Sequence, residues 1–229
     1  MMASAAQARR KPAESVSAGK RAGDGKRFAS LLGKAAALIA SKGYHHTSMR
    51  DVSRAADCSL AGLYHYFESK EDVLFQIQQR FFSTLVDEQV AIRDSDEPVE
   101  QRFRALIQHH LAFFDKHADE LKVCTFELHS LTGEQFSQVA AIRRKYFQLM
   151  AHVMRDLLDE GSGKATDLRV RQQTMFLFGA LNWIFMWYDT RKDGPVDKVG
   201  EELTQLVLHG LRGKPGAAGA TKKASRSRP

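Results

Sequence analysis

The sequence predicts an all-α protein in two parts, an N-terminal head of three helices that contains a helix-turn-helix and a C-terminal bundle of six helices. Three observations support this fold class. The chain of 229 residues contains only five prolines. Its apolar residues recur at the three-to-four-residue spacing of amphipathic helices. Between Thr47 and Lys70, two short amphipathic segments flank a polar break.

Composition and charge divide the chain into four segments. Residues 1–26 form a basic arm and residues 214–229 a basic tail, and both are expected to be disordered because they lack apolar periodicity. Residues 27–70 form the helix-turn-helix head, and residues 71–213 form the body. Of the formal charge of +7, residues 1–27 and 214–229 each contribute +5, so the segment between them carries −3. The two ends can attract a polyanion non-specifically, or they can simply keep the protein soluble.

The first helix of the head is expected to run from Phe28 to about Ser41. Its apolar residues form a wide stripe on one face: Phe28, Leu31, Leu32, Ala35, Leu38 and Ile39. Gly43 is expected to end this helix, because glycine readily adopts the left-handed conformation that closes helices.

The helix-turn-helix follows directly. Thr47 or Ser48 can cap a helix that runs to about Ala56. The polar residues 57–59 interrupt it, and Ser59 can cap a second short helix from Leu60 to about Tyr66. Small residues on both segments allow the two helices to cross closely, as this motif requires: Ala55, Ala56, Ala61 and Gly62.

The body begins with a long helix that Ser69 caps and that ends near Arg93. About 24 residues at 1.5 Å each span roughly 36 Å, so this helix can join the head rigidly to the bundle. Pro98 suits the first turn of the next helix. The remaining helices are expected over 99–116, 117–130, 134–160, 167–188 and 195–211.

The segment 167–188 is apolar almost all round, and a helix of that kind must be buried on every side. It is too short, and too interrupted by Asn182, to serve as a membrane span. We therefore expect no membrane association. A partner subunit could bury it together with the helix over 195–211, so these eighth and ninth predicted helices indicate a homodimer with a four-helix interface.

In a helix-turn-helix the second helix enters the major groove of double-stranded DNA with its N-terminal residues nearest the base edges. Here those residues lack Arg, Asn and Gln, the side chains that make bidentate base contacts. We therefore expect readout through His65, apolar contacts with thymine methyls and DNA shape. Hydroxyl and ammonium groups around the motif are expected near phosphates. The candidate DNA-binding residues are Thr47, Ser48, Ser59, Leu60, Ala61, Gly62, Tyr64, His65, Tyr66 and Lys70.

The run from Phe28 to Leu74 resembles the N-terminal domain of TetR-type transcriptional repressors. The resemblance lies in Gly43-Tyr44 before the cap, in the LYHYF run that ends at Phe67, and in SKED, which begins at Ser69. It implies that Tyr64 and Lys70 hold phosphates and that a dimer reads a palindromic operator. Members of that family often carry Lys or Arg where this chain has Leu60, and Thr or Ser where it has Gly62.

The body contains more aromatic residues than a plain bundle needs, although most of them are expected to be ordinary core. A few polar groups lie within apolar segments, and buried polar groups need partners, of which a ligand is one. Apolar walls with a few convergent polar groups are typical of a small-molecule effector site. The candidate ligand-binding residues are His110, Glu127, Arg143, Phe147, Asn182, Trp183 and Trp187.

Arg143 belongs to a cationic run, RRK, that is ordinarily a solvated face but could instead meet the phosphates of a bulky anionic ligand. The segment from Glu127 to Asp189 is similar to TetR-type regulators that respond to fatty or steroid-ring acyl-CoA thioesters. That similarity is looser than the resemblance of the head. It implies an effector that is partly apolar and partly phosphate.

We expect neither enzymatic activity nor a cofactor, because the chain has no GxSxG, GxxxxGK[ST] or HExxH motif. The two adjacent histidine pairs point to different sides of a helix or turn, unlike a chelating pair, so no metal site is expected. Cys58 and Cys124 have no CxxC partner and are expected to be free thiols of a reducing cytoplasm.

The sequence therefore favours a cytoplasmic, homodimeric transcriptional repressor whose operator binding is controlled by a small, largely apolar effector of the acyl-CoA kind. One alternative is a non-specific DNA-binding protein driven by its basic ends. Another is an effector-binding protein that no longer reads DNA.

Overall fold

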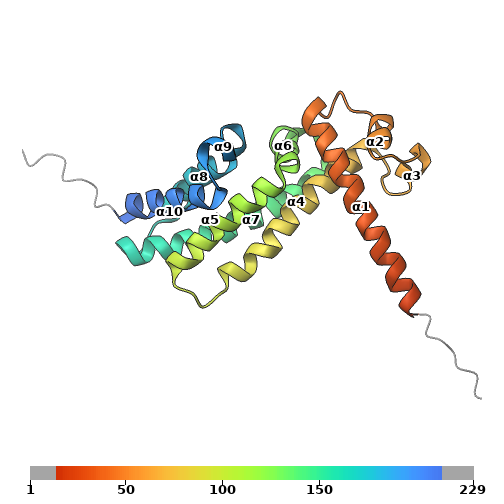
Figure 1. The fold of residues 1–229 in the computed structure, drawn as a ribbon. Coiled ribbons are helices and arrows are strands. Elements are labelled where there is room, and N and C mark those ends of the chain that lie inside the picture. The colour runs from red at the N-terminus through yellow and green to blue at the C-terminus, as the bar shows by residue number, and fades with distance from the viewer. Residues whose placement is uncertain (1–13, 213–229) are drawn as a thin grey trace, which may run out of the picture.

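The computed structural model describes residues 14–212, and this part of the chain is helical with no β-strand. The head consists of α1 (Glu14–Lys42), α2 (Met49–Ala55) and α3 (Leu60–Tyr64), and α4 (Lys70–Arg93) leads from it into the body. Figure 1 shows α2 and α3 at one end of the molecule and α4 running away from them. The predicted all-α class and the helix-turn-helix head are confirmed.

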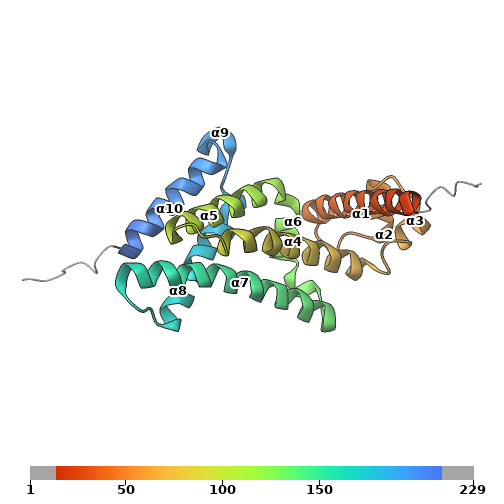
Figure 2. The ribbon, with the colours of Figure 1, turned by 90° about the horizontal axis from the view of Figure 1, so that it is seen from below.

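The other long helices of the body are α5 (Val99–Lys116), α6 (Ala118–Phe126), α7 (Gly133–Ser162), α8 (Asp167–Asn182) and α10 (Val196–Arg212). Three single turns connect some of them: η1 (Leu128–Ser130), η2 (Ile184–Met186) and α9 (Thr190–Asp193). In Figures 1 and 2, α4, α5 and α7 lie side by side, with α8 and α10 at the end remote from the head. The short α6 packs against both α4 and α1, so it touches the body and the head.

The first helix is longer than expected. It begins at Glu14 rather than Phe28, so the expectation that residues 14–26 are disordered is wrong. Residues 24–27 of this segment lie at the surface, where a helix needs no apolar stripe. Extending an existing helix is favourable where nucleating one is not, and this segment contains good helix formers such as Ala, Lys and Arg. Residues 1–13 of the arm and the tail over 214–229 lie outside the described part of the chain.

The helix ends of the head follow the predicted signals. Gly43 ends α1 with φ +82°, and its amide donates to the Ile39 carbonyl at 2.8 Å. Ser48, rather than Thr47, caps α2 and forms a capping box with Asp51. The Ser48 hydroxyl accepts from the Asp51 amide, and the Asp51 carboxylate accepts from the Ser48 amide. Ser59 caps α3 by accepting from the Gly62 amide at 3.0 Å. Local capping residues therefore set where both short helices begin.

The segment expected as one helix over 167–188 is shorter. The helix α8 ends at Asn182, and the chain then passes through η2 and α9 before α10 begins. This reversal brings α10 back along α5, against which it packs. Hydrophobicity alone could not show it, because a straight and a broken apolar segment have the same composition.

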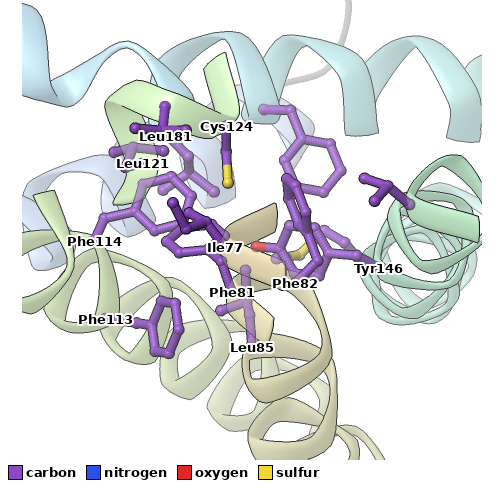
Figure 3. Packing of buried hydrophobic residues seen from close by; sticks show 14 of the residues in the cluster. Ile77, Phe81, Phe82, Leu85, Phe113, Phe114, Leu121, Cys124, Tyr146 and Leu181 are labelled. Carbon is purple, nitrogen blue, oxygen red and sulfur yellow. The ribbon is translucent and has the colours of Figure 1, made fainter. Parts of the chain in front are cut away.

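One continuous core connects these helices. Figure 3 shows aromatic residues of α4 and α5 packed against α6, α7 and α8. The rings of Phe81 and Phe113 meet edge to face with centroids 5.2 Å apart, an arrangement that stabilises aromatic pairs beyond their buried area. Both cysteines are free, as predicted, and Cys124 is buried in this core. Within residues 14–212, no helix is both long enough and apolar enough to cross a membrane.

Candidate DNA-binding surface and effector cavity

The end of the head presents the residues that the sequence assigned to DNA. Ser48, Ser59, Ala61, Tyr64 and His65 are exposed. The side chain of Tyr64 is 50% exposed although it is large and aromatic, so it is free to contact a partner. Ser59, Ala61, Tyr64 and His65 belong to α3 or its caps, and Ser48 caps α2.

Three further candidates are only partly exposed. Leu60 and Tyr66 pack against the core of the head, and the rings of Tyr66 and Phe28 lie 6.3 Å apart. At Gly62 a Cβ atom would lie 3.1 Å from the Ser59 hydroxyl oxygen, which is tight. Glycine at this position therefore leaves the cap of α3 undisturbed.

Thr47 does not belong to this surface. Its side chain is 1% exposed, and its hydroxyl donates to the Gly43 carbonyl at 2.9 Å. The structure therefore gives Thr47 a role in closing the turn before α2. The sequence offered two adjacent hydroxyl residues as caps, and the packing of the turn buried the first and exposed the second.

Lys70 is held by the head itself. Its ammonium group donates to the Tyr44 carbonyl at 3.1 Å and lies 4.3 Å from the centroid of the Tyr44 ring. A cation over an aromatic face is stabilised by the ring quadrupole. Lys70 is partly exposed, so it can still approach a phosphate, but it also fastens α4 to the turn before α2.

Sequence reasoning overlooked the cations of α2. Arg50 and Arg54 are both exposed, and they lie four residues apart on one face of the helix. Arg54 is 3.9 Å from the Asp51 carboxylate, with its own side chain 76% exposed. Their spacing was a readable signal, because residues four apart share a helix face. In this motif the first helix crosses the DNA backbone, where such cations would meet phosphates.

The body contains a cavity of about 260 Å³ lined by residues of α4, α5, α6, α7 and α8. Figure 3 shows several of its walls, including Phe82, Phe114, Leu121, Cys124 and Tyr146. The full lining comprises Phe82, Phe114, Leu121, Cys124, Thr125, Arg143, Tyr146, Phe147, Met175, Phe178 and Asn182. Of the seven candidate ligand residues, the structure places Arg143, Phe147 and Asn182 on this wall.

Arg143 is the cation of the cavity. One of its guanidinium nitrogens, Nη1, is buried without a hydrogen-bond partner in the described part of the chain. The guanidinium carbon lies 5.2 Å from the centroid of the Phe82 ring. Burial lowers the pKa of Arg143, and the nearby Cys124 opposes this shift. The neighbouring Arg144 and Lys145 are exposed, so only the first member of the cationic run points inward.

His110 supports the cavity wall from behind. It is fully buried, and its Nδ1 forms a hydrogen bond with the Tyr146 hydroxyl, which faces it from α7. Burial lowers the pKa of His110 to about 3, with a smaller effect in the same direction from His109. The imidazole is therefore neutral at neutral pH. His110 does not line the cavity, because Tyr146 takes that place on the wall.

Glu127 lies elsewhere. One carboxylate oxygen accepts from the Tyr44 amide at 3.1 Å, and the other accepts from the Ser130 hydroxyl at 2.9 Å. Its backbone carbonyl accepts from the Gln78 side chain at 3.1 Å. The assignment of Glu127 to the cavity is therefore wrong. A carboxylate within an apolar segment needs hydrogen-bond donors, and the Tyr44 amide of the head is one of them.

Trp183 and Trp187 were also misplaced. They are 52% and 53% exposed, and neither lines the cavity. The helix expected over 167–188 ends at Asn182, so Trp183 and Trp187 lie beyond it. Trp187 instead lines a separate apolar groove of about 350 Å³ between α8 and α10, opposite Leu206.

Several wall residues gave no signal in the sequence. Phe82, Tyr146 and Phe178 occur at ordinary core spacing, and only the packing of the five helices around the cavity shows that they line it. Within residues 14–212, no group of three or more His, Cys, Asp or Glu residues could hold a metal ion.

Comparison with known proteins agrees with this arrangement of a DNA-binding head and a cavity-bearing body. Residues 31–77 match the family model described as bacterial regulatory proteins, tetR family, and residues 96–211 match the tetracyclin repressor-like C-terminal domain. The chain belongs to the TetR family. A curated relative in this family is the transcriptional repressor KstR2 of Rhodococcus jostii, 26% identical over 79% of this chain and 89% of its own length.

Solved TetR-family structures show the same fold. A regulator from Bordetella parapertussis superimposes with a TM-score of 0.73 at 27% identity, over 79% of this chain and 93% of its own. The AibR protein, solved in complex with isovaleryl coenzyme A and operator DNA, superimposes with a TM-score of 0.67 at 27% identity. That match covers 81% of this chain and 97% of AibR.

Proposed function

We propose that this TetR-family protein is a transcriptional repressor whose binding to a palindromic operator is controlled by a small, largely apolar effector of the acyl-CoA class. The observation that carries the proposal is the position of α6. Cys124 and Thr125 of α6 line the cavity, and Glu127, directly after this helix, binds the Tyr44 amide of the head. A ligand that displaces α6 therefore acts on the turn that precedes the helix-turn-helix.

The mechanism requires differential affinity. A ligand can shift the protein toward a form with altered head positions only if it binds that form better than the DNA-bound form. The route from the cavity to the head is short, since α6 packs against α1 and α4 and both belong to or enter the head. Release of the operator upon effector binding follows if the altered spacing no longer fits two half-sites.

A palindromic operator has two half-sites, and a dimer supplies the second DNA-binding head that the second half-site needs. At the end remote from the head, large apolar side chains of α8, η2 and α10 lie at the surface of the single chain, including Phe176 at 69% and Leu206 at 71% exposure. Exposed apolar surface of this kind marks interaction sites. We assign α8 and α10, the eighth and ninth helices expected from the sequence, to the dimer interface.

Two relatives support the regulator class and the effector class. KstR2 is named a repressor, and AibR was solved with an acyl-CoA thioester together with operator DNA. The identity with each is modest, so the effector is assigned as a class. Because an operator lies on the chromosome, the proposal places the protein in the cytoplasm.

The test is a gel-shift titration of the full chain against DNA from upstream of its own gene, with excess non-specific competitor. The titration is repeated with a panel of acyl-CoA thioesters that includes isovaleryl-CoA. A discrete shift that survives the competitor and is abolished by one thioester supports both parts of the proposal. A shift that ignores every thioester removes the acyl-CoA class, and binding that the competitor abolishes favours a non-specific binder instead.

A further inference from the structure

Some polar groups of the cavity have hydrogen-bond partners, and others do not. The Thr125 hydroxyl donates to the Leu121 carbonyl at 2.8 Å, and the Tyr146 hydroxyl pairs with His110. Arg143 keeps a buried nitrogen without a partner. Asn182 is exposed and lies on the lining beside Met175, which is 48% exposed, so these two residues mark the side open to solvent.

The lining contains no carboxylate that could neutralise Arg143. The nearby thiol of Cys124 does not do so, because burial raises its pKa and keeps it neutral. A buried charge is stable only when it is paired or hydrogen-bonded. The cavity therefore offers a cationic donor and no anionic acceptor, a combination that selects for a ligand oxygen and against amines or other cations.

The size of the cavity limits the ligand. At roughly 30 Å³ for each water-sized group, the volume of about 260 Å³ holds about eight or nine non-hydrogen atoms. A carboxylic acid of about six carbons meets this limit. Its chain would contact the apolar walls, among them Phe114, Leu121 and Phe178.

From these observations we propose that Arg143 recognises the acyl oxygen of a compact effector, either the carboxylate of a short free acid or the carbonyl of its thioester. The inference rests on the proposed function and names the ligand chemistry of the same cavity. In the thioester case the large carrier group leaves the cavity on the side of Met175 and Asn182. In the free-acid case the whole ligand is enclosed.

The test measures binding of hexanoate, hexan-1-ol and hexanoyl-CoA to the full chain by isothermal titration calorimetry. We expect hexanoate or hexanoyl-CoA to bind at least about tenfold more tightly than the alcohol, because a hydrogen bond to a charged group is worth about 1.5–3 kcal/mol. The acyl probe with the higher affinity shows whether the effector is the free acid or the thioester. Arg143→Gln should reduce the affinity of that probe by about 10- to 100-fold while leaving the weak binding of the alcohol unchanged.

Arg144→Gln is the matched control, because it removes the same charge from the next residue of α7, where the side chain is exposed. It should leave all three affinities unchanged. The proposal is overturned if the alcohol binds as well as the acid and thioester, if Arg143→Gln changes nothing, or if neither acyl probe binds. Ligand-free Arg144→Gln should shift the operator as the wild type does. A ligand-free wild type that gives no operator shift would refute the proposed function separately from the ligand chemistry of the cavity.

A purely structural role for Arg143 makes a different prediction. A buried nitrogen without a hydrogen-bond partner, such as Arg143 Nη1, costs free energy, so an apolar side chain of similar length should not destabilise the ligand-free fold. We expect ligand-free Arg143→Met to unfold at the same or a higher temperature than the wild type. A clear fall in its unfolding temperature would assign Arg143 to the fold and overturn its role as the ligand-recognition residue.

Discussion

The carboxylate of Glu127 accepts a hydrogen bond from the backbone amide of Tyr44, 83 residues earlier in the chain, at 3.1 Å. Lys70 binds the carbonyl of the same tyrosine. The turn between α1 and α2 is therefore held from the body on one side and from α4 on the other. This turn directly precedes the helix-turn-helix, so α6 and α4 both contact the DNA-binding head at the backbone of Tyr44, in addition to their packing against α1.

Removing the Glu127 carboxylate should weaken this joint. In Glu127→Ala the Tyr44 amide and the Ser130 hydroxyl lose their acceptor, which should cost about 1–3 kcal/mol of the free energy of unfolding. Urea denaturation measures the loss. Glu127→Gln keeps one carbonyl oxygen and should cost less. Equal stabilities of all three proteins would show that water replaces the carboxylate without penalty.

The same substitution should uncouple effector binding from operator release. Glu127 does not line the cavity, so Glu127→Ala should keep its affinity for the effector. It should need more effector than the wild type to release the operator, because α6 has lost its bond to the head. Gel shifts over an effector titration test this, and an unchanged release curve would place the coupling elsewhere, for example in α4.

Tyr64 and Lys70 should contribute to DNA affinity without contributing to sequence preference. Tyr64→Phe and Lys70→Ala are expected to weaken operator and random DNA about equally. If Lys70 neutralises one phosphate, Lys70→Ala should also lower the slope of log affinity against log salt concentration by about one. His65→Ala should instead alter the preference among operator variants.

The contacts of Lys70 with Tyr44 add a complication that Tyr64 does not share. Lys70→Ala should also destabilise the head, whereas Tyr64 is half exposed and its hydroxyl can be removed without loss of packing. A salt slope that is unchanged in Lys70→Ala would make Lys70 a structural residue of the head. A selective loss on one DNA sequence would contradict the phosphate assignment for either residue.

Stability should depend on pH through His110. Its pKa is about 3 in the folded protein, whereas an exposed histidine has a pKa of about 6.5. Between these values the unfolded chain binds a proton that the folded protein excludes, so stability falls as the pH is lowered through this window and is fully present above it. From near pH 7 to near pH 5 the loss should be about 2 kcal/mol.

Urea denaturation of wild type and His110→Gln at the two pH values isolates this contribution. The faces of His110 are occupied by Tyr146, Phe114 and Phe178, and His109 precedes it on the same helix. None of the three packed rings is charged in this pH range, so the variant should lose less stability than the wild type on acidification. Parallel losses in both proteins would assign the pH dependence to other groups.

Leu206 should be needed for the dimer and not for the fold. It is 71% exposed in the single chain, so Leu206→Glu should leave the unfolding temperature of the subunit nearly unchanged. A charge buried against a partner subunit is costly, so the variant should be a monomer in sedimentation velocity and should bind the palindrome more weakly. Ala37→Glu, on the exposed side of α1, is the control. A Leu206→Glu protein that remains dimeric would move the interface away from this face.

The sequence predicted the local features of the head with good accuracy. Ser59 and Ser69 cap the helices assigned to them, and Gly43 ends α1 in the left-handed conformation. Such signals depend on neighbours within three or four residues, so they can be read without the fold. The long α4 and the limits of α5 follow from the same kind of information.

The cavity could be predicted only in part. Of the predicted ligand residues, Arg143, Phe147 and Asn182 line the cavity, whereas Glu127, Trp183 and Trp187 do not, and His110 lies one layer behind. A polar residue in an apolar run shows that a partner is needed and does not show which one. For Glu127 the partner came from the head, and for His110 it came from α7.

The sequence by itself therefore determined the helix class, the caps, the helix-turn-helix and the family, because hydrophobic period and capping are local properties of the chain. Only the tertiary structure decided which polar group remains unpaired in the cavity, where α8 ends, and that Glu127 joins the body to the head. These outcomes depend on contacts between residues far apart in the sequence, such as Tyr44 and Glu127. Packing selects such contacts from many alternatives that the same pattern of residues would allow.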